Sequence, residues 1–86
     1  MAALQVVSVF DRAIQAFGRP VFVPAVGAAL RSFGDEINRA DSEMHAHPDD
    51  FELYHLGQFD DTTGLFVGVP SGPALLLIGK NAVREG

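Results

Sequence analysis

The segment from Phe51 to Phe59 constrains the fold more than any other part of the chain, because it carries apolar residues on both of its faces. Phe51 and Leu53 fall on one side of a strand, and Tyr54 and Leu56 fall on the other, a pattern typical of a strand covered on both sides. Only one other segment has clear helical periodicity and could cover it. We therefore expect an α+β fold, with a small, largely antiparallel sheet of about four strands and one principal helix on one face.

This helix is predicted over residues 25–38, directly after a proline. Its apolar positions recur at spacings of four, three and four residues, which places them on one face of an α-helix. They are Val26, Leu30, Phe33 and Ile37. One helix cannot cover both faces of the sheet, so the second face needs another covering element or a second subunit.

The remaining elements are predicted from β-branched and apolar runs between turn residues. We expect strands at 4–10, 21–23, 51–59 and 65–69, a short helical turn at 12–17 and a hairpin loop at 60–64. Residues 74–78 fit an edge strand or a helical turn, of which we favour the strand. Residues 1–79 then form a single α+β domain, and residues 80–86 form a flexible C-terminal tail.

Length and composition exclude several classes of protein. A chain of 86 residues allows one domain, and without cysteine it has no disulfide, thiolate metal site or cysteine nucleophile. No signal peptide is visible, and no apolar run reaches the roughly 20 residues that a membrane helix needs. We expect a soluble protein of a reducing cytoplasm.

The net charge of −5 is unevenly distributed along the chain. Residues 41–79 carry seven acidic residues and no Lys or Arg, a pattern that favours a solvated acidic surface. A protein that binds DNA through phosphates needs clustered cations. The candidates for such contacts are the four arginines of the first half, Arg12, Arg19, Arg31 and Arg39.

Three groups of polar residues could carry chemistry. His45 and His47 with Asp49 or Asp50 could hold a metal ion, but Pro48 follows at once and capping or surface roles explain them more simply. The adjacent residues Asp60 and Asp61 fit the turn chemistry of Asp. No serine lies in a nucleophile-elbow pattern. We predict no catalytic residues, no metal and no cofactor, and therefore no enzymatic activity.

Aromatic residues on the predicted strands allow a further interpretation, since they could stack on the bases of single-stranded DNA. Core packing is the alternative role for most of them. Because one helix covers only one face of the sheet, we expect a homodimer or a higher homo-oligomer. The residues expected to contribute to self-association are Tyr54, Phe59, Phe66 and Leu76.

Several short runs, in order and spacing, resemble the small non-structural protein of gokushovirus-type microviruses, which are phages with single-stranded DNA genomes. The resemblance covers about residues 5–66. The runs that carry it are Val7–Ala13, Pro20–Pro24, Gly27–Phe33, His47–Tyr54 and Leu56–Asp61.

The resemblance implies a phage accessory protein that acts in viral single-stranded DNA synthesis and its coupling to genome packaging. In that role it would act in the host bacterial cytoplasm, without catalysis, through contacts with a replication initiator or a procapsid protein. The family offers no catalytic residues to transfer. Two other functions remain open: direct binding of single-stranded DNA, and a minor virion or assembly component.

Overall fold

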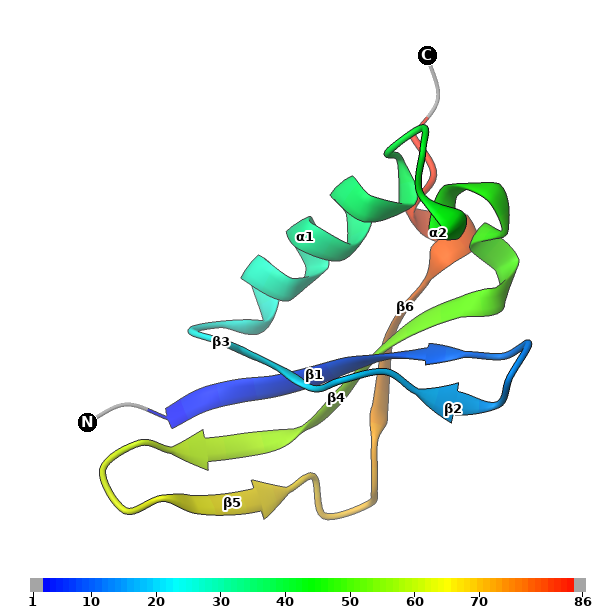
Figure 1. Ribbon diagram of the computed structural model, residues 1–86. Coiled ribbons are helices and arrows are strands. Elements are labelled where there is room, and N and C mark those ends of the chain that lie inside the picture. Colours follow the sequence, from blue (N-terminus) through cyan, green and yellow to red (C-terminus); the bar gives the residue numbers. More distant parts are fainter. Residues whose placement is uncertain (1–2, 85–86) are drawn as a thin grey trace.

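A computed structural model describes residues 3–84 of the chain (Figure 1). It has an α+β architecture, with one main helix on one face of an antiparallel sheet, so the expected class is confirmed. The strands are β1 (Ala3–Asp11), β2 (Ala16–Phe17), β3 (Val21–Val23), β4 (Phe51–Asp60), β5 (Leu65–Gly68) and β6 (Ala74–Ile78). The helices are α1 (Val26–Ile37), α2 (Glu43–Ala46) and the 3₁₀ helices η1 (Pro48–Asp50) and η2 (Gly79–Ala82). Within residues 3–84 no helix is long and apolar enough to cross a membrane.

The antiparallel pair of β1 and β4 forms the centre of the sheet. It runs from Ala3 opposite Asp60 to Asp11 opposite Phe51. Each edge of the sheet is formed by two short strands that follow one another. On one edge β2 and β3 pair with β1, and on the other β5 and β6 pair with β4. The sheet therefore has six strands rather than the expected four, because each edge is interrupted once.

The hairpin loop predicted at residues 60–64 is present and joins β4 to β5. The Asp60 carboxylate accepts hydrogen bonds from the backbone N–H groups of Thr62 and Thr63, at 2.8 and 3.3 Å. Gly64 closes the turn with a φ of 78°, a conformation that glycine adopts without strain. The Asp residue thus serves the turn, as the sequence indicates.

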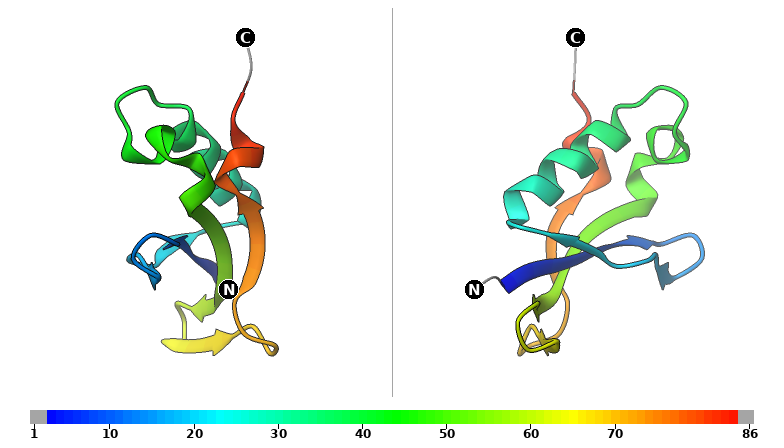
Figure 2. Two further views of the ribbon diagram at one scale, coloured as in Figure 1. Left: turned by 90° about the vertical axis from the view of Figure 1, so that its right-hand side faces the viewer. Right: turned by 60° about the vertical axis from the view of Figure 1, so that its left-hand side comes forward.

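A β-bulge in β4 separates the sheet into two parts. The register with β1 shifts between Val6, which pairs with Gly57, and Val7, which pairs with His55, so Leu56 is left without a partner on β1. Before the bulge β4 lies near α1, and after it β4 continues with β5 away from the helix (Figures 1 and 2).

The hydrophobic core lies between α1 and the helix-facing side of β1 and β4. Phe33 and Ile37 of α1 pack against Val7, Phe51 and Leu53 of the sheet. These positions follow the helical spacing read from the sequence, and the helix expected over 25–38 spans Val26–Ile37. Burying each of these large apolar side chains contributes roughly 1.5–3 kcal/mol, so this one interface accounts for much of the stability of a small domain.

The prediction of a helical turn at 12–17 is wrong. The chain reverses instead, and Phe17 of β2 pairs with Phe10 of β1. Asp11 accepts a hydrogen bond from the N–H of Ala13 at 2.9 Å, and Gln15 adopts a left-handed φ of 55°. Asp11, just before the predicted helical turn, therefore starts a tight turn instead, because the same side-chain hydrogen bond can begin either structure.

Two further segments are more ordered than expected. The connection after α1 contains α2, whose first turn is capped by the Ser42 hydroxyl accepting from the Met44 N–H. The segment expected to be a tail starts with η2, and Asn38 holds it against the end of α1. The Asn38 amide donates to the Ala82 carbonyl at 2.9 Å and accepts from the Arg84 N–H at 2.8 Å. Residues 85 and 86 of the predicted tail lie outside the described residues.

The bulge provides a test of the fold. Gly57 has a φ of +156°, and a Cβ added there would collide with the Val67 carbonyl oxygen and approach Gly68 Cα to 2.8 Å. We expect Gly57→Ala to lower the free energy of unfolding by about 1–3 kcal/mol, measured by chemical denaturation. Gly27→Ala is the control, because its Cβ meets nothing within 4 Å and replaces a helical glycine, which stabilises by up to about 1 kcal/mol. Equal effects at both sites would contradict the strained bulge.

The junction of α1 and α2 predicts a dependence of stability on pH. The pKa of Glu36 is lowered by its hydrogen bonds from Arg39 and from the Ser42 hydroxyl. Because the folded pKa lies below the unfolded one, these bonds stabilise the fold above the ordinary pKa and are lost as the pH falls through the folded pKa. Glu36→Gln should therefore flatten the acid side of the stability curve by up to about 1 kcal/mol, since exposed pairs contribute little. Parallel wild-type and variant curves in acid denaturation would contradict it.

Candidate binding surface

The aromatic side chains divide between the two faces of the sheet. Two of the eight, Phe33 and Phe51, belong to the core beneath α1. The other six form the opposite surface, which we call the aromatic face: Phe10, Phe17, Phe22, Tyr54, Phe59 and Phe66.

Strand alternation in β1 explains why these residues share a face. Val7 packs against the helix, so the flanking residues Val6 and Ser8 point to the other side, and directly opposed residues in an antiparallel pair share a face. The register places Phe22 opposite Val6 and Tyr54 opposite Ser8. Each aromatic residue is thus positioned by its pairing with β1 or with a neighbour on that face.

One aromatic group, the Phe22 cluster, comprises Phe22, Phe59 and Phe66 from three strands. Its ring centroids lie 5.4 Å apart for Phe22 and Phe59, 4.8 Å for Phe59 and Phe66, and 6.0 Å for Phe22 and Phe66. Phe66 remains 66% exposed and Phe22 42% exposed. The cluster is therefore preassembled but open to solvent.

The other group, the Tyr54 cluster, comprises Phe10, Phe17 and Tyr54 in edge-to-face contacts with centroids 4.9–6.1 Å apart. The Tyr54 hydroxyl donates to a Glu52 carboxylate oxygen at 3.1 Å. Burial, together with this hydrogen bond and the Glu52 charge, raises the pKa of the Tyr54 phenol. Tyr54 therefore acts as a neutral hydrogen-bond donor at neutral pH.

The aromatic face is hollowed where β4 bulges. A depression of about 240 Å³ is lined by Val6 and Gly57, with Pro20 and Phe66 among its other lining residues. It adjoins the Phe22 cluster through Phe66. Such a hollow beside exposed rings can receive an apolar or aromatic group from a ligand.

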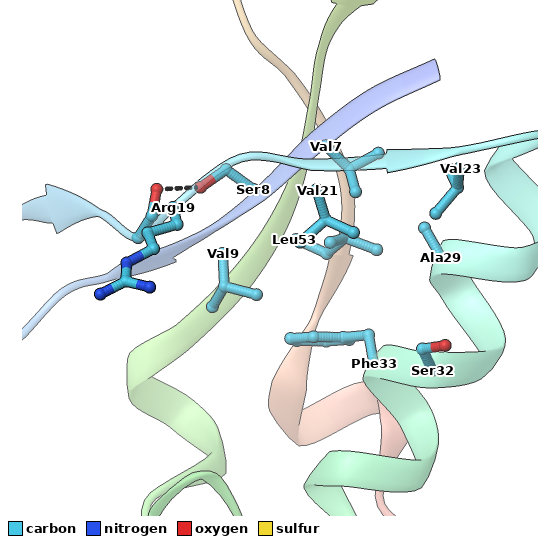
Figure 3. Close-up of a pocket in the computed structure, with 11 residues that line it drawn as sticks. Val7, Ser8, Val9, Arg19, Val21, Val23, Ala29, Ser32, Phe33 and Leu53 are labelled. Atoms are coloured by element: carbon cyan, nitrogen blue, oxygen red, sulfur yellow. Dashed lines mark hydrogen bonds between the residues drawn. The ribbon is translucent and has the colours of Figure 1, made fainter. Parts of the chain in front are cut away.

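A second cleft, of about 330 Å³, lies between α1 and the strands β1 and β3 (Figure 3). Its walls are mainly aliphatic, with Val7, Val9 and Val21 from the sheet and Phe33 from the helix. Arg19 extends at one end of it. Among its lining residues Arg19 alone is ionisable, so within the described chain this cleft lacks the pair of titratable groups that acid-base catalysis uses.

The residues predicted for self-association are not all exposed together. Tyr54, Phe59 and Phe66 lie on the aromatic face, whereas Leu76 packs against the core. Its neighbour Leu75 is 49% exposed instead. The cause is a register shift of β6 against β4 between Leu53 and Tyr54, which alternation along the sequence cannot reveal.

The four arginines belong to separate segments. Arg12 lies in the turn before β2, Arg19 between β2 and β3, Arg31 on α1, and Arg39 beyond its end. Arg39 forms ion pairs with Glu36 and with Asp41, each at 2.7 Å. Arg19 lines the cleft on the helix side of the sheet, whereas Arg12 lies near Tyr54 of the aromatic face.

Two of the three histidines, His45 and His55, form side-chain hydrogen bonds. His45 Nδ1 lies 2.9 Å from the Ile37 carbonyl oxygen, and His55 Nε2 lies 2.9 Å from Gln5 Oε1. His47 ends α2 just before η1, which contains Asp49 and Asp50. Among residues 3–84 no group of three or more His, Asp or Glu side chains is placed to hold a metal ion.

Comparison with known proteins places this fold in a family. The family model described as "Phage ORF5 protein" matches residues 4–83, almost the whole described chain. The chain belongs to the phage ORF5 protein family. Protein ORF5 of Chlamydia phage 1 is 33% identical over 69 residues, covering 76% of this chain and 72% of that protein. This confirms the resemblance to the gokushovirus-type proteins. No solved structure gives a significant match.

Sequence reasoning missed half of this surface. Phe10 and Phe17 were assigned to a strand end and a helical turn, so their contact with Tyr54 was not expected. The sequence did contain an indication of this contact. Gln15 and Gly18 flank the two-residue strand β2, whose aromatic residue Phe17 pairs with Phe10. Phe22 was placed on a strand, but its neighbours Phe59 and Phe66 depend on long-range register.

Proposed function

We propose that this phage ORF5 family protein is a non-catalytic accessory protein that acts through protein contacts made by its aromatic face. Its place of action is viral single-stranded DNA synthesis and the coupling of that synthesis to packaging, in the cytoplasm of the bacterial host. The partner would be a replication initiator or a procapsid protein. One observation carries the proposal: a preassembled, partly exposed aromatic surface on a sheet whose six strands contain neither Lys nor Arg.

The charge of the sheet favours a protein partner over DNA. Binding to a DNA backbone gains its affinity from cations that displace the counterions of phosphates. The strands offer Asp11, Glu52 and Asp60 but no cation. Exposed aromatic rings without clustered cations are instead typical of the centre of a protein–protein interface.

The proposed absence of catalysis is supported by the two apolar hollows that adjoin the sheet. The cleft beneath α1 is lined by one ionisable side chain, and the hollow beside Phe66 is lined by none, so neither pairs a nucleophile with a base. A polar hollow at η1 is lined by His47, Asp49 and Asp50, but among residues 3–84 no group of three such side chains is placed to hold a metal ion. Membership of a phage family supports a role in infection, and the aromatic face supplies the means of contact.

Direct binding of single-stranded DNA is the second candidate, favoured by the Phe22 cluster itself. Three rings within 6.0 Å of one another, two of them well exposed, could stack on successive bases. Arg12 lies near Tyr54 of the aromatic face and could reach a phosphate, whereas Arg19 lines the cleft on the helix side. This function requires Arg12 to outweigh the acidic balance of the chain.

A substitution in the phage genome tests the leading proposal. We expect Phe22→Lys to lower the yield of single-stranded genomes and infectious particles by about tenfold or more, because it places a charge in the contact surface, while duplex replicative DNA still accumulates. Strand-specific DNA quantification measures both. Val83→Lys is the matched control, since Val83 is also 42% exposed but follows η2, on the helix side. Identical yields from the two variants would contradict a role for the aromatic face.

Fluorescence anisotropy with a labelled single-stranded oligonucleotide separates the two candidates. The protein-contact function predicts no change in anisotropy at low salt. Micromolar binding that weakens steeply with salt and is lost in Phe22→Ala would instead establish the DNA-binding function. Stoichiometric recovery of the protein in purified virions would favour an assembly component.

A further inference from the structure

The outer edge of β5 lacks the features that usually protect the edge of a sheet. Leu65, Phe66 and Val67 are 63–66% exposed, and the strand contains neither a charge nor a proline. Natural edge strands are commonly guarded by such residues, because free N–H and C=O groups pair readily with another strand. The opposite edge is guarded, since Pro20 and Pro24 enclose β3.

The hydrogen bonds to β4 define which backbone groups of β5 face outward. The Val69 N–H donates to the Leu56 carbonyl at 3.0 Å, toward β4. Because successive residues of a strand alternate in direction, Val67 also bonds inward, whereas the N–H and C=O groups of Phe66 and Gly68 point away from β4. The free edge thus presents two donors and two acceptors at a spacing of two residues.

We propose that β5 pairs antiparallel with β5 of a second copy of this chain, about a two-fold axis that passes beside Val67. In this register Phe66 of each copy lies opposite Gly68 of the other, and all outward groups of both residues are used in four hydrogen bonds. Val67 faces its own counterpart on the axis. The two sheets become one continuous sheet, and the two Phe22 clusters lie on the same face of it.

Gly68 supports this register. A Cβ at this position would meet only the Leu56 carbonyl oxygen, at an ordinary 3.8 Å, and its φ does not require glycine. Within residues 3–84 there is therefore room for a side chain at this position. In the pair, the glycine leaves room for the exposed Phe66 ring of the other copy to lie across the strand, as aromatic residues do over glycines in sheets.

Charge favours a second copy at this edge. The chain carries −5 overall, so two copies repel each other over most of their surface, but residues 62–79 contain no ionisable side chain. Across the proposed axis, the Asp61 loop of one copy faces the uncharged Pro73 region of the other. The exposed side chains and the strand edge together bury on the order of 1,000 Å² in the pair, which is at the small end of specific interfaces and fits micromolar assembly.

Sedimentation velocity between about 1 and 200 μM tests the pairing. We expect wild-type protein to approach twice its chain mass of 9.2 kDa as the concentration rises. Val67→Lys should remain monomeric, with at least a tenfold weaker association, because it places two ammonium groups opposite each other on the axis. Val21→Lys, on the guarded edge and 53% exposed, should dimerise like the wild type. A monomeric wild type, or a dimer that Val67→Lys leaves intact, would overturn the proposal.

The absence of cysteine allows a test of the register that does not depend on charge. Val67→Cys places two thiols on directly opposed residues about 4.5 Å apart at Cα, within the range of a disulfide. Mild oxidation should give a covalent dimer at least tenfold faster than in Leu65→Cys, an equally exposed control whose copies lie on the order of 13 Å apart. Equal rates in the two variants would show that the strands meet only by collision and would overturn the register.

Discussion

The pairing of β1 with β4 is the constraint on which the rest of the structure depends. These two strands run side by side over nearly their whole length, and each outer strand is attached to one of them. Among the described residues α1 is the main element that packs across this pair, joined at one end by Met44 of α2 and Ala82 of η2, and it covers one face of the pair. A single chain of this size therefore forms one hydrophobic core. On the other face of its central strands, aromatic side chains form the surface.

The two faces consequently differ in chemistry. On the helix side Phe33 and Ile37 are buried, while on the other side Phe22 and Phe66 remain in contact with solvent. The bulge at Gly57 connects these facts, because it turns the second half of β4 away from the helix and carries β5 with it. The exposed rings and the free strand edge thus arise from the same local irregularity, and both serve contacts between chains in our account.

The sequence predicted what depends on local patterns. The helical spacing up to Ile37 and the Asp60 turn were recognised correctly, because periodicity and turn chemistry are encoded by neighbouring residues. Asp11 was misread, since the same carboxylate can cap a helix or a turn and only the distant pairing of Phe17 decides. The exposure of Leu75 depends on the register shift in β6, and the docking of the C-terminal segment depends on the hydrogen bonds of Asn38. Neither can be recognised from a local sequence pattern. The sequence therefore predicted that most of the aromatic residues lie on strands, but not which of their rings would pack together.

Solvent access to individual phenylalanine rings tests the central claim, that one sheet face is closed and the other open. In NMR spectra of ring-labelled protein, a neutral soluble paramagnetic chelate should strongly enhance the relaxation of Phe17 and Phe22. The same chelate should leave Phe33 and Phe51 nearly unchanged, because they are buried beneath α1. If the rings of Phe17 and Phe22 were as well protected as those of Phe33 and Phe51, the chain would cover its own second face, and the account of an open aromatic surface would be wrong.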